Sequence, residues 1–258
     1  MKTVKDMTPI LQVGDRTITA EEIVPLLTSY QILPRLLVEI VIDRVIAPII
    51  CTPEEIADNY QQFCQQHQIS SEAERQAWLQ RYHMNPGQLA ALATRSLRIE
   101  KFKQVLWGNK VESYFLSCKS QLDRVIYSLI RTQDMAIAQE LYFRILEQEQ
   151  SFAELARNYS HGSEARTGGC IGPVELSTCH PTLAKMLSVS QPGQLWTPMH
   201  IGEWVAIVRL EKLIPAQLDE TMRQRLLNEM FAEWLQKQLN QLSDPIPQLV
   251  PPAKLASR

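Results

Sequence analysis

Several residues that commonly bind metal ions fall within one part of the chain: His161, Cys170, Cys179, His180 and His200. Imidazole and thiolate are the ligands that zinc prefers in structural sites. Such sites usually bring ligands in pairs about two to four residues apart, and here only Cys179 and His180 are close in sequence. Because adjacent residues of an extended chain point in opposite directions, this spacing argues against zinc. We expect neither a metal ion nor a cofactor.

The five cysteines are scattered and contain no Cys-x-x-Cys pair, a pattern typical of unpaired buried thiols in a reducing compartment. Residues 1–20 include lysines, but they lack the continuous apolar stretch and the cleavage signal of an export sequence. We therefore expect a cytoplasmic protein, or a periplasmic or otherwise extracytoplasmic one if an export signal has been removed.

Length and charge narrow the class of protein. A chain of 258 residues exceeds the usual size of one domain, roughly 100 to 200 residues, which favours two domains. The 26 basic and 28 acidic residues are balanced along the whole chain, so no basic face indicates a nucleic-acid partner. The most apolar stretch, residues 32–50, carries charged side chains such as Arg35 and Asp43, which would be costly in a bilayer. We expect a core helix there and no transmembrane segment.

Helix-start signals dominate the N-terminal half of the chain. Residues 11–19 indicate a short extended piece around a Gly-Asp turn. Thr52, followed by proline and two glutamates, has the cap residue and first-turn acids that stabilise a helix N-terminus. Ser71 and Asn85 begin similar segments. The sequence predicts an all-helical N-terminal domain over residues 1–122.

After residue 122 the pattern changes to mixed elements. Residues 125–130 form a short β-rich run, residues 134–148 carry a helix signal, and residues 204–210 indicate a final strand. Glycine- and serine-rich loops separate these short elements. We expect a second, α+β domain over residues 123–215.

Residues 216–258 return to a helical pattern before a proline-rich tail. Within the helix signal, residues 218–242, Met222, Met230 and Trp234 lie near one face. This apolar face needs a partner, and we expect the helix to pack on the N-terminal domain.

Four short motifs occur in order along residues 123–213. They are Ser-Phe-Ala-Glu-Leu-Ala at 151–156, Tyr-Ser at 159–160, Gly-Gly-Cys-Ile-Gly at 168–172 and Gln-Pro-Gly-Gln-Leu at 191–195. In order and spacing they resemble the parvulin family of peptidyl-prolyl isomerases. The resemblance implies a four-stranded antiparallel sheet with surrounding helices. The first motif is then a helix packed on the sheet, and the glycines form a turn at its edge.

The same resemblance implies where the catalytic residues lie. Parvulins carry two histidines that face each other on adjacent strands, and a cysteine or aspartate in a loop. Matching the motifs puts Tyr127 and Trp204 at the histidine positions and Gly162 at the loop position. His161, beside Gly162, is the alternative occupant of the polar position; otherwise it is a solvated loop histidine. Since the usual polar groups are replaced, we expect weak or lost isomerase activity.

The substrate pocket also departs from the family pattern. The shelf that holds the proline ring falls on Cys179 and Leu183, and Ser188 stands where a further aromatic residue is usual. The resemblance thus implies a reduced proline pocket.

The order of the parts is similar to that of the SurA/PrsA class of foldases, in which a helical domain, a parvulin domain and a C-terminal helix follow one another. The opening at residues 13–19 and the helix at residues 219–242 resemble segments that pack into one chaperone core in that class. This implies a folding factor that binds unfolded or proline-containing polypeptide. The alternatives are an active isomerase with an atypical site and a scaffold that recruits a protein-export partner.

Overall fold

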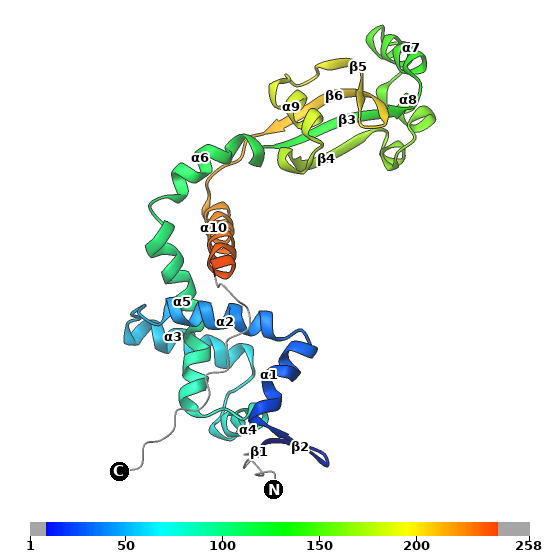
Figure 1. Cartoon of the computed structure of the whole chain (residues 1–258). Coiled ribbons are helices and arrows are strands. Elements are labelled where there is room, and N and C mark those ends of the chain that lie inside the picture. The colour runs from blue at the N-terminus through cyan, green and yellow to red at the C-terminus, as the bar shows by residue number, and fades with distance from the viewer. Residues whose placement is uncertain (1–8, 242–258) are drawn as a thin grey trace, which may run out of the picture. The chain divides into compact units, whose positions relative to one another are not determined.

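The computed structural model describes residues 9–241 and divides the chain into two compact units (Figure 1). Within the described residues, one unit holds residues 9–109 together with residues 225–241, and the other holds Lys110–Gln224. Helix α6, Val111–Leu122, lies in the second unit, whereas the sequence analysis placed it with the helical domain. The domain boundaries at 122 and 215 stay a prediction. The proline-rich tail lies outside the described residues.

The first unit is helical apart from one hairpin, as expected. The hairpin pairs β1 (Pro9–Val13) with β2 (Arg16–Thr19) through the turn at Gly14, where φ is +59°. The helices that follow in this unit are α1 (Ala20–Ser29), α2 (Leu33–Ile46), α3 (Pro53–Gln66), α4 (Glu72–Tyr82) and α5 (Pro86–Trp107).

The predicted helix starts are confirmed in their hydrogen bonds. At α3 the backbone N–H of Glu55 donates to Thr52 Oγ1 at 3.3 Å, and the Thr52 N–H donates to the Glu55 carboxylate at 2.8 Å. Helices α4 and α5 begin with the same reciprocal pattern at Ser71 and Asn85. These bonds satisfy backbone donors that have no partner inside the helix.

The apolar stretch near the N-terminus is helical, and α2 buries Leu33, Ile42 and Ile46. Among the described residues, no single helix is long and apolar enough to cross a membrane. The pair α1 and α2, bent by 107° at the break between them, passes a test of length and composition together.

From Arg225 onward, helix α10 (Glu220–Gln241) belongs to the first unit, where it packs on α5. Lys103 of α5 is 6% exposed, and its ammonium donates to Asn228 Oδ1 at 2.6 Å. Next to it, Phe102 and Trp107 meet Phe231 and Trp234 with ring centroids 5.3 to 6.4 Å apart. The apolar face of the C-terminal helix therefore has aromatic partners from the N-terminal part of the chain.

The second unit contains a four-stranded antiparallel sheet with strand order β4-β3-β6-β5, which confirms the predicted α+β class. Besides α6, its elements are β3 (Arg124–Thr132), α7 (Met135–Leu146), α8 (Phe152–Tyr159), the 3-10 helix η1 (Ser163–Thr167), β4 (Cys170–Glu175), the 3-10 helix η2 (Leu176–Thr178), α9 (Pro181–Val189), β5 (Leu195–Ile201) and β6 (Trp204–Ile214).

The two faces of this sheet bury different helices because strand side chains alternate. Val125, Tyr127 and Leu129 of β3 lie in one core cluster with residues of α9. Ile130 lies in a second cluster with residues of α7 and α8. The motif at residues 151–156 forms the start of α8, as the resemblance implied. The face that holds Tyr127 also carries the candidate site.

We expect Trp234→Ala to lower the free energy of unfolding of the first unit by about 2 kcal/mol. The substitution removes ring contacts with Phe102, Trp107 and Phe231. Urea unfolding followed by circular dichroism measures the change. As a control, Phe143→Ala removes a ring that is 55% exposed and should cost less than about 0.5 kcal/mol. Equal stability of Trp234→Ala and the unaltered protein would show that α10 does not depend on this contact.

Candidate functional site

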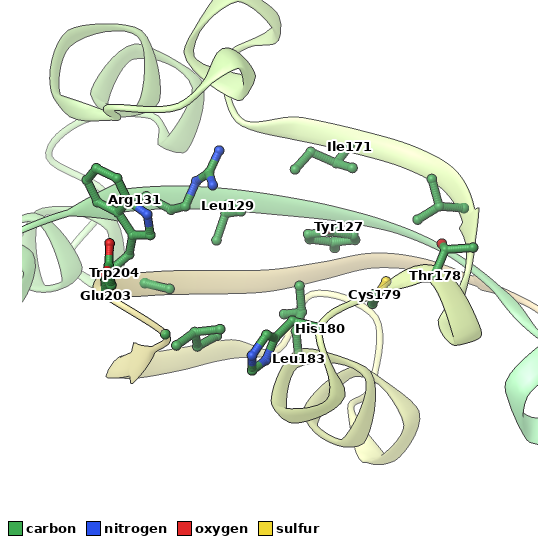
Figure 2. Close-up of a pocket in the computed structure, with 14 residues that line it drawn as sticks. Tyr127, Leu129, Arg131, Ile171, Thr178, Cys179, His180, Leu183, Glu203 and Trp204 are labelled. Carbon is green, nitrogen blue, oxygen red and sulfur yellow. The ribbon is translucent and has the colours of Figure 1, made fainter.

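A cavity of about 550 Å³ lies on the α9 side of the sheet (Figure 2). Its volume is within the range of about 300 to 1,000 Å³ that small-ligand sites occupy. Its lining comes from β3, β4, η2, α9, the β5–β6 turn and β6: Tyr127, Leu129, Arg131, Ile171, Val174, Thr178, Cys179, His180, Leu183, Ile201, Gly202, Glu203, Trp204 and Ala206.

Strand geometry explains why these side chains meet. Tyr127, Leu129 and Arg131 are two residues apart on β3, so they share one face. Ala206 of β6 lies directly opposite Arg131, and Trp204, two residues away, points to the same side. Leu129 and Ala206 thus give this face an apolar stretch, with Tyr127 on one side of it and Arg131 and Trp204 on the other. His180 and Glu203 also line the cavity.

Tyr127 and Cys179 mark one end of the cavity. Burial raises the pKa of Tyr127 to about 12, with a further contribution from Cys179. Burial also raises the pKa of the Cys179 thiol, whose Sγ lies 3.7 Å from the carbonyl oxygen of Glu175. The phenol interacts with this thiol. Near neutral pH both side chains are therefore uncharged.

Arg131 and Glu164 form an ion pair at the other end. Arg131 Nε and Nη2 donate to the two carboxylate oxygens of Glu164 at 2.8 and 2.5 Å, and Ser160 Oγ donates to the same carboxylate at 2.7 Å. The Glu164 side chain is 2% exposed and that of Arg131 is 33% exposed. Burial raises the pKa of the Glu164 carboxyl, but the hydrogen bonds from Arg131 and Ser160 outweigh it and leave the pKa below its ordinary value. Glu164 is ionised at neutral pH.

This ion pair occupies the space beside Gly162. A Cβ atom at residue 162 would overlap with Arg131 Nη2 and with both carboxylate oxygens of Glu164. The backbone of Gly162, with φ of −98°, would accept other residues, so the restriction is one of space. The Arg131 guanidinium, which extends from β3, thus occupies the space that a side chain at residue 162 would fill.

Trp204 lies next to this guanidinium. The Arg131 Cζ is 6.0 Å from the centroid of the Trp204 ring, within range of a cation–π contact. The His161 ring meets Trp204 edge-on, with centroids 5.8 Å apart. The backbone N–H of His161 donates to the backbone carbonyl oxygen of Arg131 at 3.0 Å. His161 does not line the cavity, although it contacts two residues that do.

The strand register does not bring Tyr127 and Trp204 face to face. Leu210 is the residue of β6 opposite Tyr127, and six residues, about 20 Å of strand, separate it from Trp204. The implied pairing of two facing residues is therefore not found at these positions. Tyr127 and Trp204 instead stand at opposite ends of one cavity (Figure 2).

The three pocket residues expected from the sequence are divided between two hollows. Cys179 and Leu183 line the main cavity, where Leu183 is 5% exposed. Ser188 is exposed and lines a separate hollow of about 400 Å³ between α6, η2 and α9, which Cys179 also borders. The structure therefore does not bring Ser188 to the main cavity.

Arg131 is one of the cavity residues that the sequence analysis did not name as part of the site. Counting two and four residues from Tyr127 along a strand would have placed Leu129 and Arg131 on its face. Its partner Glu164 lies 33 residues further along the chain, and no local pattern connects the two.

The cysteine and histidine residues form no metal site in the part of the chain that the structure describes. No group of three or more His, Cys, Asp or Glu side chains there has an arrangement that could hold a metal ion. All five cysteines are free thiols.

Comparisons with known proteins assign the class of the second unit. Residues 130–212 match the family model described as the PPIC-type PPIASE domain, or rotamase. PrsA, a peptidylprolyl isomerase from Bacillus cereus, is similar in structure, with 17% sequence identity over 95% of both chains and a TM-score of 0.51. A search of curated proteins found no match.

Two further solved structures have lower structural scores. The parvulin domain of PpiD from E. coli is 29% identical over 39% of this chain and 97% of its own, with a TM-score of 0.32. A SurA-like chaperone from Campylobacter jejuni is 16% identical over 91% of this chain and 94% of its own, with a TM-score of 0.37.

Residues 130–212 are thus a PPIC-type, parvulin-class peptidyl-prolyl isomerase domain, as the sequence motifs implied. The chain as a whole combines this domain with a helical unit in the fold of the PrsA-like foldases.

We expect Glu164→Gln to lower the free energy of unfolding of the second unit by about 2 kcal/mol at pH 7, because hydrogen bonds to charged groups each contribute roughly that much. The folded-state pKa of Glu164 is lowered, so its stabilisation is present above the unfolded-state pKa and is lost as the pH falls through the folded-state value. The difference between the two proteins should therefore shrink in acid, which urea unfolding at pH 7 and below pH 4 measures.

Gly162→Ala tests the same pair by crowding it. Its methyl group would displace the guanidinium, so the variant should lose stability at pH 7. Gly87→Ala, at a helical position where a Cβ atom meets its nearest neighbour at 3.3 Å, is the matched control and should cost little. If Glu164→Gln and Gly162→Ala were both as stable as the unaltered protein, the pair would not be important for the fold of this unit.

Proposed function

We propose that the protein is a folding factor that binds extended, proline-containing polypeptide in the cavity of its PPIC-type domain and catalyses prolyl isomerisation weakly. The observation that carries the proposal is the cavity itself. It has an apolar middle formed by Leu129, Leu183 and Ala206, and it has hydrogen-bonding groups at both ends. The family match of residues 130–212 supports the same conclusion.

The cavity suits the chemistry of an X-Pro bond. The proline ring is apolar and has no backbone N–H, so an apolar surface can cover it without leaving a donor unsatisfied. Rotation about the bond crosses a barrier of about 18 to 20 kcal/mol and needs no covalent step. An enzyme therefore needs only to favour the twisted amide over the planar one.

Weak catalysis follows from the groups at the Tyr127 end. The pKa of Tyr127 is raised to about 12 and that of Cys179 is also raised. Neither group changes charge between pH 6 and 8, and the phenol already interacts with the thiol. At this end of the cavity, one neutral hydroxyl is then available to the substrate.

The cellular location and further partners are proposals as well. The cytoplasmic location expected from the sequence has no support in the comparisons. One similar structure comes from a report on two SurA-like chaperones of Campylobacter jejuni, of which Cj1289 is described as periplasmic. An extracytoplasmic location is the alternative to test for this chain, together with a partner in protein export.

Closing the cavity from its rim tests the proposed binding site. Thr178 is exposed and lines the cavity, so Thr178→Trp should block it without disturbing the core. We expect the unaltered protein to bind a short peptide with one proline and the variant to bind at least about tenfold more weakly, which corresponds to about 1.4 kcal/mol. Isothermal titration calorimetry measures both.

Thr197→Trp is the matched control, because Thr197 is exposed on β5 and does not line the cavity. It should bind the peptide as the unaltered protein does. Suppression of the aggregation of a denatured model protein should accompany peptide binding. An unaltered protein that neither binds the peptide nor suppresses aggregation would favour the scaffold over the folding factor.

We expect Tyr127→Phe to lower the isomerisation rate by at most about tenfold, since a single neutral hydrogen bond contributes roughly 1 kcal/mol. The contributions of Tyr127, Cys179 and Glu164 to the rate should be nearly constant between pH 6 and 8, because the pKa values of Tyr127 and Cys179 are raised and that of Glu164 is lowered. NMR exchange measurements on a proline peptide determine both. A pH-dependent rate that becomes flat in His161→Ala would assign the chemistry to His161 instead.

A further inference from the structure

Arg131 has a hydrogen-bonding group that the ion pair does not use. Its Nε and Nη2 atoms donate to Glu164, and Nη1 has no hydrogen-bond partner within residues 9–241. A guanidinium has five N–H donors in a fixed planar arrangement, so holding two nitrogens also fixes the direction of the third. The Arg131 side chain is one-third exposed, and it lines the cavity.

The Gly162 loop leaves this guanidinium in place. No side chain from residue 162 competes for the position, since a Cβ atom there would overlap with Nη2. The Trp204 ring lies beside the guanidinium at 6.0 Å from Cζ, and Ala206, opposite Arg131 on β6, has a side chain too short to cover it. A molecule in the cavity can therefore reach the Arg131 donors from the apolar side.

The electronic structure of an amide determines what such a donor does. In the planar X-Pro bond the nitrogen lone pair is delocalised into the carbonyl group. Twisting the bond localises the lone pair on nitrogen, which then becomes a hydrogen-bond acceptor. A donor directed at that nitrogen binds the twisted amide more strongly than the planar one, which is the condition for catalysis.

We propose that Arg131 is a catalytic residue of this site and donates a hydrogen bond from Nη1 to the nitrogen of the twisted prolyl amide. This inference rests on the proposed function, since it requires a proline peptide in the cavity. Glu164 is its positioning residue, because the two-point contact holds the guanidinium before the substrate binds and lowers the cost of orienting it. The donor keeps its proton throughout, so no proton transfer accompanies the rotation.

The test compares Arg131→Lys and the double variant Arg131→Met/Glu164→Met with the unaltered full-length protein. Lysine keeps a charge for Glu164 but lacks the planar fork, and the double variant removes the pair without leaving a buried carboxylate unpaired. The probe is a short peptide with one proline, whose isomerisation is followed by NMR exchange and whose dissociation constant is measured by calorimetry. We expect both variants to lower the catalysed rate of the bound peptide by about tenfold to a hundredfold, and to change the dissociation constant by less than about threefold.

Arg209→Met is the matched control. Arg209 is 32% exposed, and its Nε donates to Glu211 at 2.8 Å, but it does not line the cavity. It should leave the catalysed rate unchanged. The inference is overturned if Arg131→Lys and the double variant keep the original catalysed rate, or if Arg209→Met lowers that rate as much as they do. It is also overturned if the variants change only peptide binding, or if the unaltered protein binds the peptide without accelerating its isomerisation. Failure of the proposed function is distinguishable, because the unaltered protein would then not bind the peptide at all.

Discussion

The ion pair between Arg131 and Glu164 is the interaction on which the second unit and its cavity depend. A carboxylate that is 2% exposed needs charged or hydrogen-bonding partners, and Glu164 receives them from Arg131 and Ser160. The contact ties η1, which follows the end of α8, to strand β3. It also excludes a side chain at residue 162, so the loop, the strand and the end of the cavity are determined together.

The rest of the cavity follows from ordinary sheet geometry. Alternation along β3 places Tyr127 and Leu129 against apolar side chains of α9 and puts Arg131 on the same face. Helix α9 begins beside the cavity, with His180 as its N-cap and Pro181 as its first residue. The apolar part of the cavity is the surface that the proposed function assigns to a proline ring, and the polar groups beside it are those it assigns to the peptide backbone.

The sequence predicted those parts of the structure that local interactions control. Thr52, Ser71 and Asn85 cap helices because each side chain bonds to the backbone N–H of the residue three positions further along the chain. The motif at 151–156 likewise starts the expected helix. The site was less predictable. Gly162 suggested a lost polar group, yet its space is filled by a residue from a strand 31 positions earlier in the chain. The register that separates Tyr127 from Trp204 likewise depends on the pairing of β3 with β6, which spacing alone does not determine.

Under the proposed function, a proline peptide occupies the cavity and reaches Arg131. An NMR titration of the full chain with such a peptide tests it directly, by following the side-chain Nε–H signals of arginine and tryptophan, assigned with Arg131→Lys and Trp204→Phe. We expect the signals of Arg131 and Trp204 to shift together and in a saturable way, while that of Arg209 stays in place. Shifts confined to the tryptophans of the helical unit, or none at saturating peptide, would contradict it.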